Sequence, residues 1–238
     1  MVAGVADGVE HSTWSKRGAK HASAAFIESV AIAVHANVPF DDSLWAHLQR
    51  EVAREFHQNL MQRLRQDEER IVREGQVAPA WSVQPYRDRF FSPEGAKHRR
   101  AWFQSTLLAT ALGPHGGFAL LLGDGLIRVD RLRRGHWDAP TLAKLSAEVV
   151  SSFYLTEEQV ECSLVPIRAK DAEKIAVLMA THGVEKSSKQ ALDGKDWPQL
   201  GIKSASDCET YLLDLADRPK DQVEWGNMSL AFVERDVE

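Results

Sequence analysis

The 238-residue sequence lacks the features that mark several classes of protein. It has only two cysteines, Cys162 and Cys208, too few for a disulfide framework and too far apart for a zinc-binding pattern. No apolar run approaches the roughly 18 residues that span a bilayer, and no basic start followed by a long apolar segment marks a secretory signal. The net charge of −5 argues against a general nucleic-acid binder. We therefore expect a cytoplasmic protein with reduced thiols, and neither a membrane nor a nucleic acid among its partners.

The composition that is present, 44% hydrophobic and 26% charged residues, is that of an ordinary globular protein. A chain of this length can bury one full core, so one or two domains are expected. Predicted strands and helices occur in blocks rather than in strict alternation, which favours an α+β fold over a doubly wound sheet. The predicted strands span 2–6, 102–111, 118–122, 126–129, 163–167, 175–179 and 228–233, and the predicted helices span 17–35, 139–151 and 206–215, with a longer helix capped by Asp41 or Asp42.

The longer helix is predicted from an apolar residue at every fourth position, a spacing that winds slowly around a helix: Leu44, Leu48, Val52, Phe56, Leu60 and Leu64. The charged run 65–70 is interpreted as a solvent-exposed continuation of this helix toward Glu74. Residues 75–100 contain three prolines and are predicted to form a loop. The basic clusters 97–100 and 128–134 are interpreted as solvent-exposed, and the alternative is a contact to phosphate or to an acidic peptide.

Four short motifs lie at predicted strand ends or in the turns between strands. They are Val-Ala-Asp-Gly-Val at 5–9, Gly-Asp-Gly at 123–125, Ala-Thr-His-Gly-Val at 180–184 and Gly-Asn-Met-Ser-Leu at 226–230. The Asp-Gly pair of the second motif stands between two apolar runs, which predicts a β-hairpin there. Asp-Gly alone occurs in many chains, so the interpretation depends on the order and spacing of all four motifs.

In this order the motifs resemble those of the PPM-type, or type 2C, metal-dependent serine/threonine protein phosphatases, in a bacterial branch of the family. Residues 104–109 resemble the family's Gly-Thr-Thr strand, and residues 152–156 resemble a segment that precedes its Thr-Asp-Gly strand. The resemblance covers most of the chain and implies a two-sheet antiparallel β-sandwich flanked by helices, as a single domain over 1–238. It implies a phosphorylated protein as substrate or partner. It also implies two Mn²⁺ or Mg²⁺ ions, held by aspartates, that deprotonate a water for in-line attack on phosphorus.

Three departures from the family pattern bear on that activity. His182 and Asn227 stand where the family carries metal-binding aspartates, and we expect the usual opening strand pair with its acidic segment to be missing. The resemblance gives as candidate metal residues Asp7 with the Gly8 carbonyl, Asp124, His182 and Asn227, and assigns no residue to catalysis itself. Mn²⁺ and Mg²⁺ favour carboxylate oxygens, whereas Asn227 offers an uncharged oxygen and His182 a nitrogen. We therefore expect metal affinity to fall sharply.

Two functions of different classes stay open from the sequence. One is a metal-dependent phosphatase with a weakened or altered dinuclear site, and the other is a pseudophosphatase that serves as a binding or regulatory module. Metal-dependent turnover separates the two. A metal site remodelled from Asp7, His11 and His182 is weighed against an exposed His11 with no ligand role. An unrelated α+β protein with chance motifs is the third hypothesis, which a structure lacking two stacked antiparallel sheets would establish.

Overall fold

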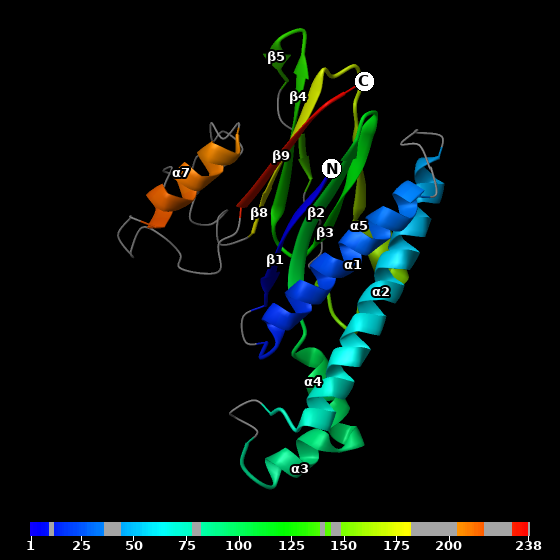
Figure 1. Cartoon of the computed structure of the whole chain (residues 1–238), viewed down its shortest axis with the longest axis vertical. Coiled ribbons are helices and arrows are strands. Elements are labelled where there is room, and N and C mark those ends of the chain that lie inside the picture. The colour runs from blue at the N-terminus through cyan, green and yellow to red at the C-terminus, as the bar shows by residue number, and fades with distance from the viewer. Residues whose placement is uncertain are drawn as a thin grey trace.

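Two antiparallel β-sheets stacked face to face form the centre of the computed structural model shown in Figure 1. The structure describes residues 1–9, 12–35, 44–77, 82–138, 141–143, 149–181, 204–216 and 230–237. The first sheet has the order β1-β2-β3-β7, with β1 Val2–Gly8, β2 Ser105–Gly113, β3 Gly116–Leu122 and β7 Leu164–Arg168. The second has the order β5-β4-β8-β9, with β6 also paired to β4; these are β4 Leu126–Arg133, β5 His136–Trp137, β6 Thr141–Ala143, β8 Lys174–Ala180 and β9 Leu230–Asp236.

Strand β3 shows why the first sheet is covered on both faces. All seven of its residues are buried. Ala119 and Leu121 pack against side chains of the second sheet, whereas Phe118, Leu120 and Leu122 pack under helices. Successive side chains of a strand point to opposite faces, so a strand that is apolar throughout needs cover on both sides.

Helices supply that cover on the outer face of each sheet. Helices α1 (Ser15–His35) and α2 (Trp45–Glu74), with α5 (Glu157–Ser163), pack on the first sheet. Helix α7 (Ala205–Ala216) packs on the second sheet, where Cys208 contacts a cluster that includes Leu178 and Ala180 of β8. The result is the predicted α+β sandwich with flanking helices. No helix in the described ranges is long and apolar enough to cross a membrane.

Helix α2 extends beyond the sandwich, because its 30 residues span roughly 45 Å at 1.5 Å per residue. Figure 1 shows its C-terminal half below the sheets, packed against α3 (Tyr86–Phe91), η2 (Pro93–Gly95) and α4 (Ala96–Ala101). We call residues 65–77 and 82–101 the arm. The Phe90 ring at its centre stacks on Trp102 at a centroid distance of 5.1 Å and meets Trp14 edge-on at 5.8 Å.

Three predictions about local structure are wrong. In the predicted loop 75–100, residues 86–100 are not a loop, because α3, η2 and α4 form there around the buried Phe90. Gly123–Gly125 is not a hairpin turn, because β3 and β4 belong to different sheets and the three residues carry the chain from one to the other. The described part of 139–151 is not helical, since 141–143 form β6 and Ser151 makes an isolated β-bridge to Ser105.

The interpretation of the charged runs as solvent-exposed is also wrong in part. Asp67 and Glu68 of the run 65–70 are only 4% and 7% exposed, and Arg99 and Arg128 of the two basic clusters are 6% and 3% exposed. Each of these groups has an ion-pair partner, which is the condition under which charges are found buried.

The starts of α5 and α7 differ from the sequence-based predictions. Ser204, not Ser206, caps α7, because its Oγ accepts a hydrogen bond from the Asp207 amide at 3.1 Å. The candidate caps Asp41 and Asp42 lie outside the described residues. Helix α5 was not predicted, although Thr156 and Gln159 form a capping box that the Thr-x-x-Gln spacing signals in the sequence.

Candidate functional site

Strand ends from both sheets meet at one end of the sandwich, and three of the five candidate metal residues lie there. Gly8, the last residue of β1, pairs with Ser105 at the start of β2. Ala180, the last residue of β8, pairs with Leu126 at the start of β4 and with Leu230 at the start of β9. Gly123–Gly125 connects the end of β3 to the start of β4. We call this end, with Asp7, Gly8 and 123–125, the site edge.

Asp7 and Gly8 are held between β2 and the start of α1. Asp7 is half-buried and pairs with Thr106, whose Oγ1 donates a long hydrogen bond of 3.4 Å to the Asp7 carbonyl oxygen. Gly8 lies against Ser15 so closely that a Cβ on residue 8 would be 2.2 Å from the Ser15 Oγ. A side chain larger than hydrogen would therefore push the first turn of α1 away from the strand.

Asp124 reaches the same end from the other side of β2. Gly123 has φ of +109°, and a Cβ there would lie 2.5 Å from the Thr106 Cγ2. Thr106 thus touches both the first and the second motif. Because β2 lies between β1 and β3 in the sheet, the strands that lead to Asp7 and Asp124 run roughly 10 Å apart. The two half-buried aspartates therefore reach the edge from strands on either side of β2.

The remaining candidate residues are not placed. His182 follows Ala180 by two positions and Asn227 precedes Leu230 by three, but both lie outside the described residues, as do His11 and the neighbouring Glu10, Glu185 and Asp193. Within the described ranges, no three His, Cys, Asp or Glu side chains are grouped so that they could hold a metal ion. The oxygens of Asp7, Gly8 and Asp124 suit a hard cation, but they do not by themselves complete a dinuclear site.

Thr106 and Ser105 also shape the site edge, and they were not identified as such from the sequence. Thr106 bridges the motifs, and the fully buried Ser105 exchanges both backbone hydrogen bonds with Ser151 at 3.0 and 2.8 Å. The sequence signal was available for the strand, since residues 104–109 resemble the family's Gly-Thr-Thr segment. It did not reveal that this strand would separate the two aspartates.

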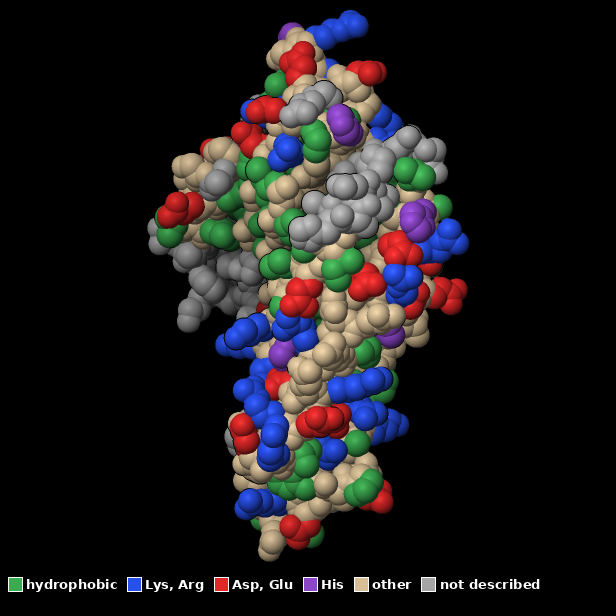
Figure 2. Space-filling view, turned by 45° about the vertical axis from the view of Figure 1, so that its right-hand side comes forward, with side chains coloured by type: hydrophobic (Ala, Val, Ile, Leu, Met, Phe, Trp, Pro, Cys, Tyr) green, Lys and Arg blue, Asp and Glu red, His purple; other side chains and the backbone are tan. Residues whose placement is uncertain are grey.

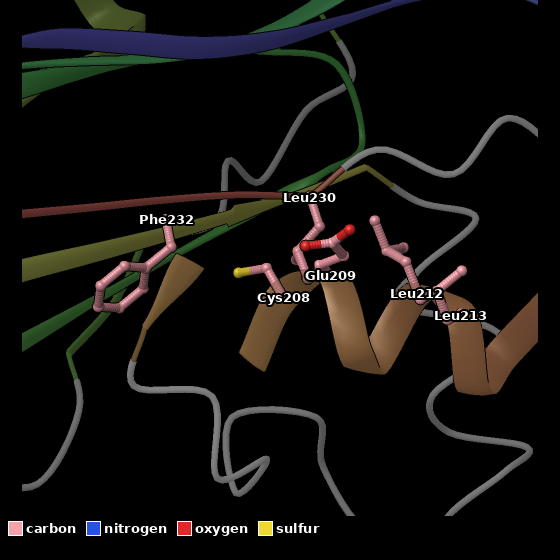
Figure 3. A pocket seen from close by; sticks show the side chains of 6 residues that line it. All are labelled: Cys208, Glu209, Leu212, Leu213, Leu230 and Phe232. Carbon is pink, nitrogen blue, oxygen red and sulfur yellow. The ribbon is translucent and has the colours of Figure 1, made fainter. Parts of the chain in front are cut away.

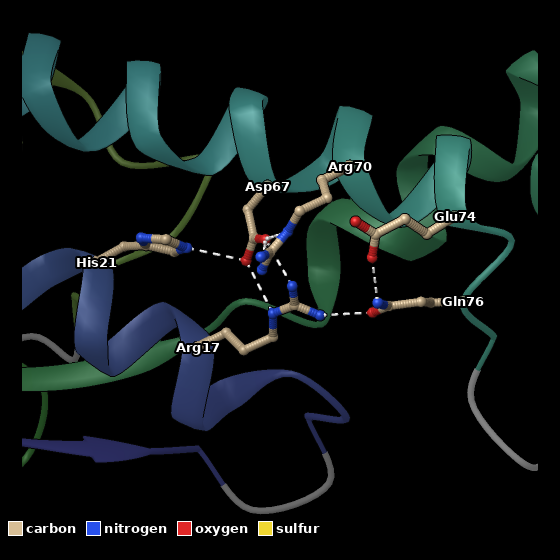
Figure 4. A network of polar contacts seen from close by, with 6 residues as sticks. All are labelled: Arg17, His21, Asp67, Arg70, Glu74 and Gln76. Atoms are coloured by element: carbon tan, nitrogen blue, oxygen red, sulfur yellow. Dashed lines mark hydrogen bonds and ion pairs between the residues drawn. The ribbon is translucent and has the colours of Figure 1, made fainter.

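A network of charged groups fixes the direction of α1 beside Gly8 (Figure 4). The Asp67 carboxylate of α2 accepts from the Arg17 guanidinium at 2.9 and 2.6 Å and from Arg70 at 2.7 Å, and lies 2.9 Å from the His21 Nε2. Burial alone would raise the pKa of Asp67, but the hydrogen bonds from His21, Arg17 and Arg70 hold it below its usual value. Asp67 is therefore ionised at neutral pH, and its ion pairs with Arg17 and His21 hold α2 against α1.

A pocket of about 410 Å³ lies elsewhere, on the outer face of the second sheet. Figure 3 shows its lining from α7 and β9: Cys208, Glu209, Leu212, Leu213, Leu230 and Phe232. Burial raises the pKa of the Cys208 thiol to about 11, so this thiol is protonated at neutral pH. A protonated thiol is a poor nucleophile, and the lining is mostly apolar, so the pocket offers no centre for phosphate chemistry.

A family model described as protein phosphatase 2C matches residues 1–216 of the chain. The chain belongs to the protein phosphatase 2C family. The match includes the first three of the four motifs and ends before Asn227. No curated protein sequence matches the chain.

Solved structures of bacterial phosphatases resemble the chain at low identity. PppA, a key regulatory component of T6SS in Pseudomonas aeruginosa, is 19% identical, with a TM-score of 0.47 over 99% of this chain and 86% of PppA. The serine/threonine phosphatase PstP of Mycobacterium tuberculosis is 14% identical, with a TM-score of 0.46 over 100% of this chain and 88% of PstP. A further structure of the PstP catalytic domain, 13% identical with a TM-score of 0.46 over 100% of this chain and 87% of that one, holds two manganese ions.

Proposed function

We propose that this phosphatase 2C domain acts on phosphoserine or phosphothreonine in proteins through a weakened dinuclear metal site. The observation that supports the proposal is the position of Asp7 and Gly8 at a strand end, with Asp124 across β2 at the same edge. Family membership supplies the reaction class. In this proposal Asp7, the Gly8 carbonyl, Asp124, His182 and Asn227 occupy the metal-ligand positions.

The metal site is expected to be weak because it has too few negative charges. Two divalent cations bring four positive charges, which carboxylates must offset, and by the motif resemblance Asp7 and Asp124 are the carboxylates that this sequence offers for the purpose. Asn227 contributes no charge, and a protonated His182 would repel a cation. When bound, the ions would supply charge neutralisation at phosphate and a water of lowered pKa. Mn²⁺ is the first ion to test, because the PstP catalytic domain was solved with two manganese ions.

The second candidate function is that of a pseudophosphatase, a domain that binds a phosphorylated partner without hydrolysing it. The replacement of two expected aspartates by His182 and Asn227 favours this candidate specifically. Both candidates retain a phosphorylated protein as the ligand. They differ in turnover alone.

The experiment is hydrolysis of p-nitrophenyl phosphate across titrations of Mn²⁺, Mg²⁺ and Zn²⁺, with an Asp7→Asn variant alongside. Slow turnover that depends on the metal and disappears in Asp7→Asn is the expected result. Turnover with Zn²⁺ in preference to Mn²⁺ would point to His182 as a nitrogen ligand. An absence of turnover with every metal, in protein shown by circular dichroism to be folded, would reject the first candidate and favour the pseudophosphatase.

A further inference from the structure

The arm differs in charge from the rest of the chain. Residues 65–101 include eight Arg or Lys and six Asp or Glu, a net charge of +2, whereas the whole chain carries −5. Figure 2 shows Lys and Arg side chains gathered over the lower part of the molecule, where the arm lies. The positive charge is therefore concentrated on one projecting element.

Two of the arm's acidic side chains are buried in ion pairs. Asp67 is held by Arg17, Arg70 and His21. The Glu68 carboxylate, 9% exposed, accepts from Arg99 at 3.2 Å and from Arg100 at 3.1 Å. These pairs compensate Arg70, Arg99 and Arg100, and the arm keeps five other basic side chains against four exposed carboxylates, those of Glu69, Glu74, Asp88 and Glu94.

Five basic side chains on the arm are exposed and make no ion pair or side-chain hydrogen bond with any described residue: Arg65, Arg73, Arg87, Arg89 and Lys97. Arg73 and Arg87 belong to the far end of the arm, and an Arg87 guanidinium nitrogen lies 3.9 Å from where a Cβ on Gly75 would be. Helix α3 thus begins beside the C-terminal end of α2.

Apolar side chains are exposed at the same far end. Tyr86 is 55%, Val83 65% and Val72 36% exposed, and all three adjoin Arg87 or Arg73 in sequence or within a turn. Tyrosine and arginine together, with apolar surface between them, are enriched where proteins bind proteins. We call Val72, Arg73, Val83, Tyr86 and Arg87 the arm tip.

The base of the arm is joined to the site edge by backbone hydrogen bonds. The Trp14 amide donates to the Trp102 carbonyl at 2.9 Å, and the Val9 amide donates to the Gln104 carbonyl at 3.1 Å. Residues 102–104 follow α4 directly, and Val9 follows Gly8. A protein held on the arm would therefore be held on the same side of the molecule as Asp7.

We propose that the arm tip binds an acidic segment of a protein partner and so holds that partner beside the site edge. The proposal deepens the proposed function and rests on it for the phosphorylated nature of the partner. The binding step itself requires only charge complementarity and the exposed Tyr86 ring.

The test measures fluorescence anisotropy of a labelled peptide made of glutamates with one leucine and one phosphoserine, added to the whole chain at low salt. Matched probes replace phosphoserine by serine, or glutamates by lysines. The variant Arg73→Glu/Arg87→Glu is expected to bind the acidic peptide at least about tenfold more weakly. The control Arg50→Glu/Arg134→Glu reverses the same charge at exposed arginines away from the arm and should change affinity less than about twofold. Tyr86→Ala, which leaves the charge intact, should also weaken binding.

The serine peptide is expected to bind nearly as tightly as the phosphoserine peptide, because the arm tip responds to negative charge rather than to phosphate. Failure of the native chain to bind, equal binding of the lysine peptide, equal losses in the two double variants, or binding that requires the phosphate would each overturn the proposal. Turnover of p-nitrophenyl phosphate should be unchanged in the arm variants. An inactive chain whose arm tip still binds the acidic peptide would reject the proposed phosphatase function and leave the docking surface in place.

Discussion

The site edge and the arm are stabilised by different interactions, although backbone hydrogen bonds such as Val9–Gln104 join them. At the site edge, strand pairing and close backbone contacts determine the geometry: Gly8 against Ser15 and Gly123 against Thr106 leave no room for a side chain. In the arm, buried ion pairs and an aromatic cluster hold short helices together.

The contrast explains what each region can tolerate. Strand pairing is collective, so a single charge change at the sandwich surface alters little. A buried carboxylate that holds two arginines is not replaceable by a neighbour, because its loss leaves charge in a low-dielectric surrounding. The arm should therefore be the part of the molecule most sensitive to the loss of single charges.

The largest expected effect comes from Glu68→Ala, which leaves the buried Arg99 without a carboxylate. We expect the free energy of unfolding to fall by about 4 kcal/mol. Glu69→Ala, the exposed neighbour on the same helix, should change it by less than about 0.5 kcal/mol. Urea denaturation of both variants provides the comparison, and similar losses in the two would contradict the role given to the Glu68 ion pairs.

The next largest effect tests the close contact between Gly123 and Thr106 at the site edge. Gly123→Ala combines a positive φ with a clash against Thr106 and should lower the free energy of unfolding by about 3 kcal/mol. Gly135→Ala has a positive φ of 76° but no atom near the added Cβ, and should lower it by about 1 kcal/mol. Thermal unfolding that ranks the two variants in the opposite order would show that Thr106 does not crowd this turn.

A smaller effect, with a pH dependence, is expected for Asp67→Asn. Removing the carboxylate that accepts from Arg17 and Arg70 should lower the free energy of unfolding by about 2 kcal/mol at neutral pH. The folded-state pKa of Asp67 is depressed, so its contribution is complete above the unfolded-state pKa of about 3.9 and is lost as pH falls through the lower folded value. The native chain and the variant should converge in stability only in strong acid. A stability difference that is constant from neutral to strongly acidic pH would show that the charge of the Asp67 carboxylate does not stabilise the fold.

The smallest effect concerns the cysteines and leaves stability unchanged. Cys162 is exposed, whereas Cys208 is buried and its pKa is raised to about 11. A disulfide reagent at neutral pH should therefore modify Cys162 in the folded chain and reach Cys208 only after unfolding. Modification of Cys208 in folded Cys162→Ser protein at a comparable rate would show that the contact between α7 and β9 opens readily.

The same contrast explains how much the sequence could predict. Apolar runs such as 118–122 and the stripe from Leu48 to Leu64 predicted the sandwich strands and α2, because burial of apolar side chains determines both. The burial of Asp67, Glu68 and Arg99 was not predicted, since the pairs Arg17–Asp67 and Arg99–Glu68 join residues 50 and 31 positions apart and charge runs carry no periodic signal. The motif aspartates were recognised, and Asp7 and Asp124 do lie at one edge. The separation of the two by β2 depends on strand order, which local sequence does not encode.

The most direct test of the account is a calorimetric Mn²⁺ titration of the native chain, of His182→Asp/Asn227→Asp, and of each protein with Asp7→Asn added. A weakened metal site predicts weak Mn²⁺ binding by the native chain and binding at least about tenfold tighter once both carboxylates are restored. Adding Asp7→Asn should abolish Mn²⁺ binding in both proteins. Native binding as tight as that of the restored variant, or a restored variant that binds no better than the native chain, would contradict the claim that His182 and Asn227 weaken a metal site at this edge.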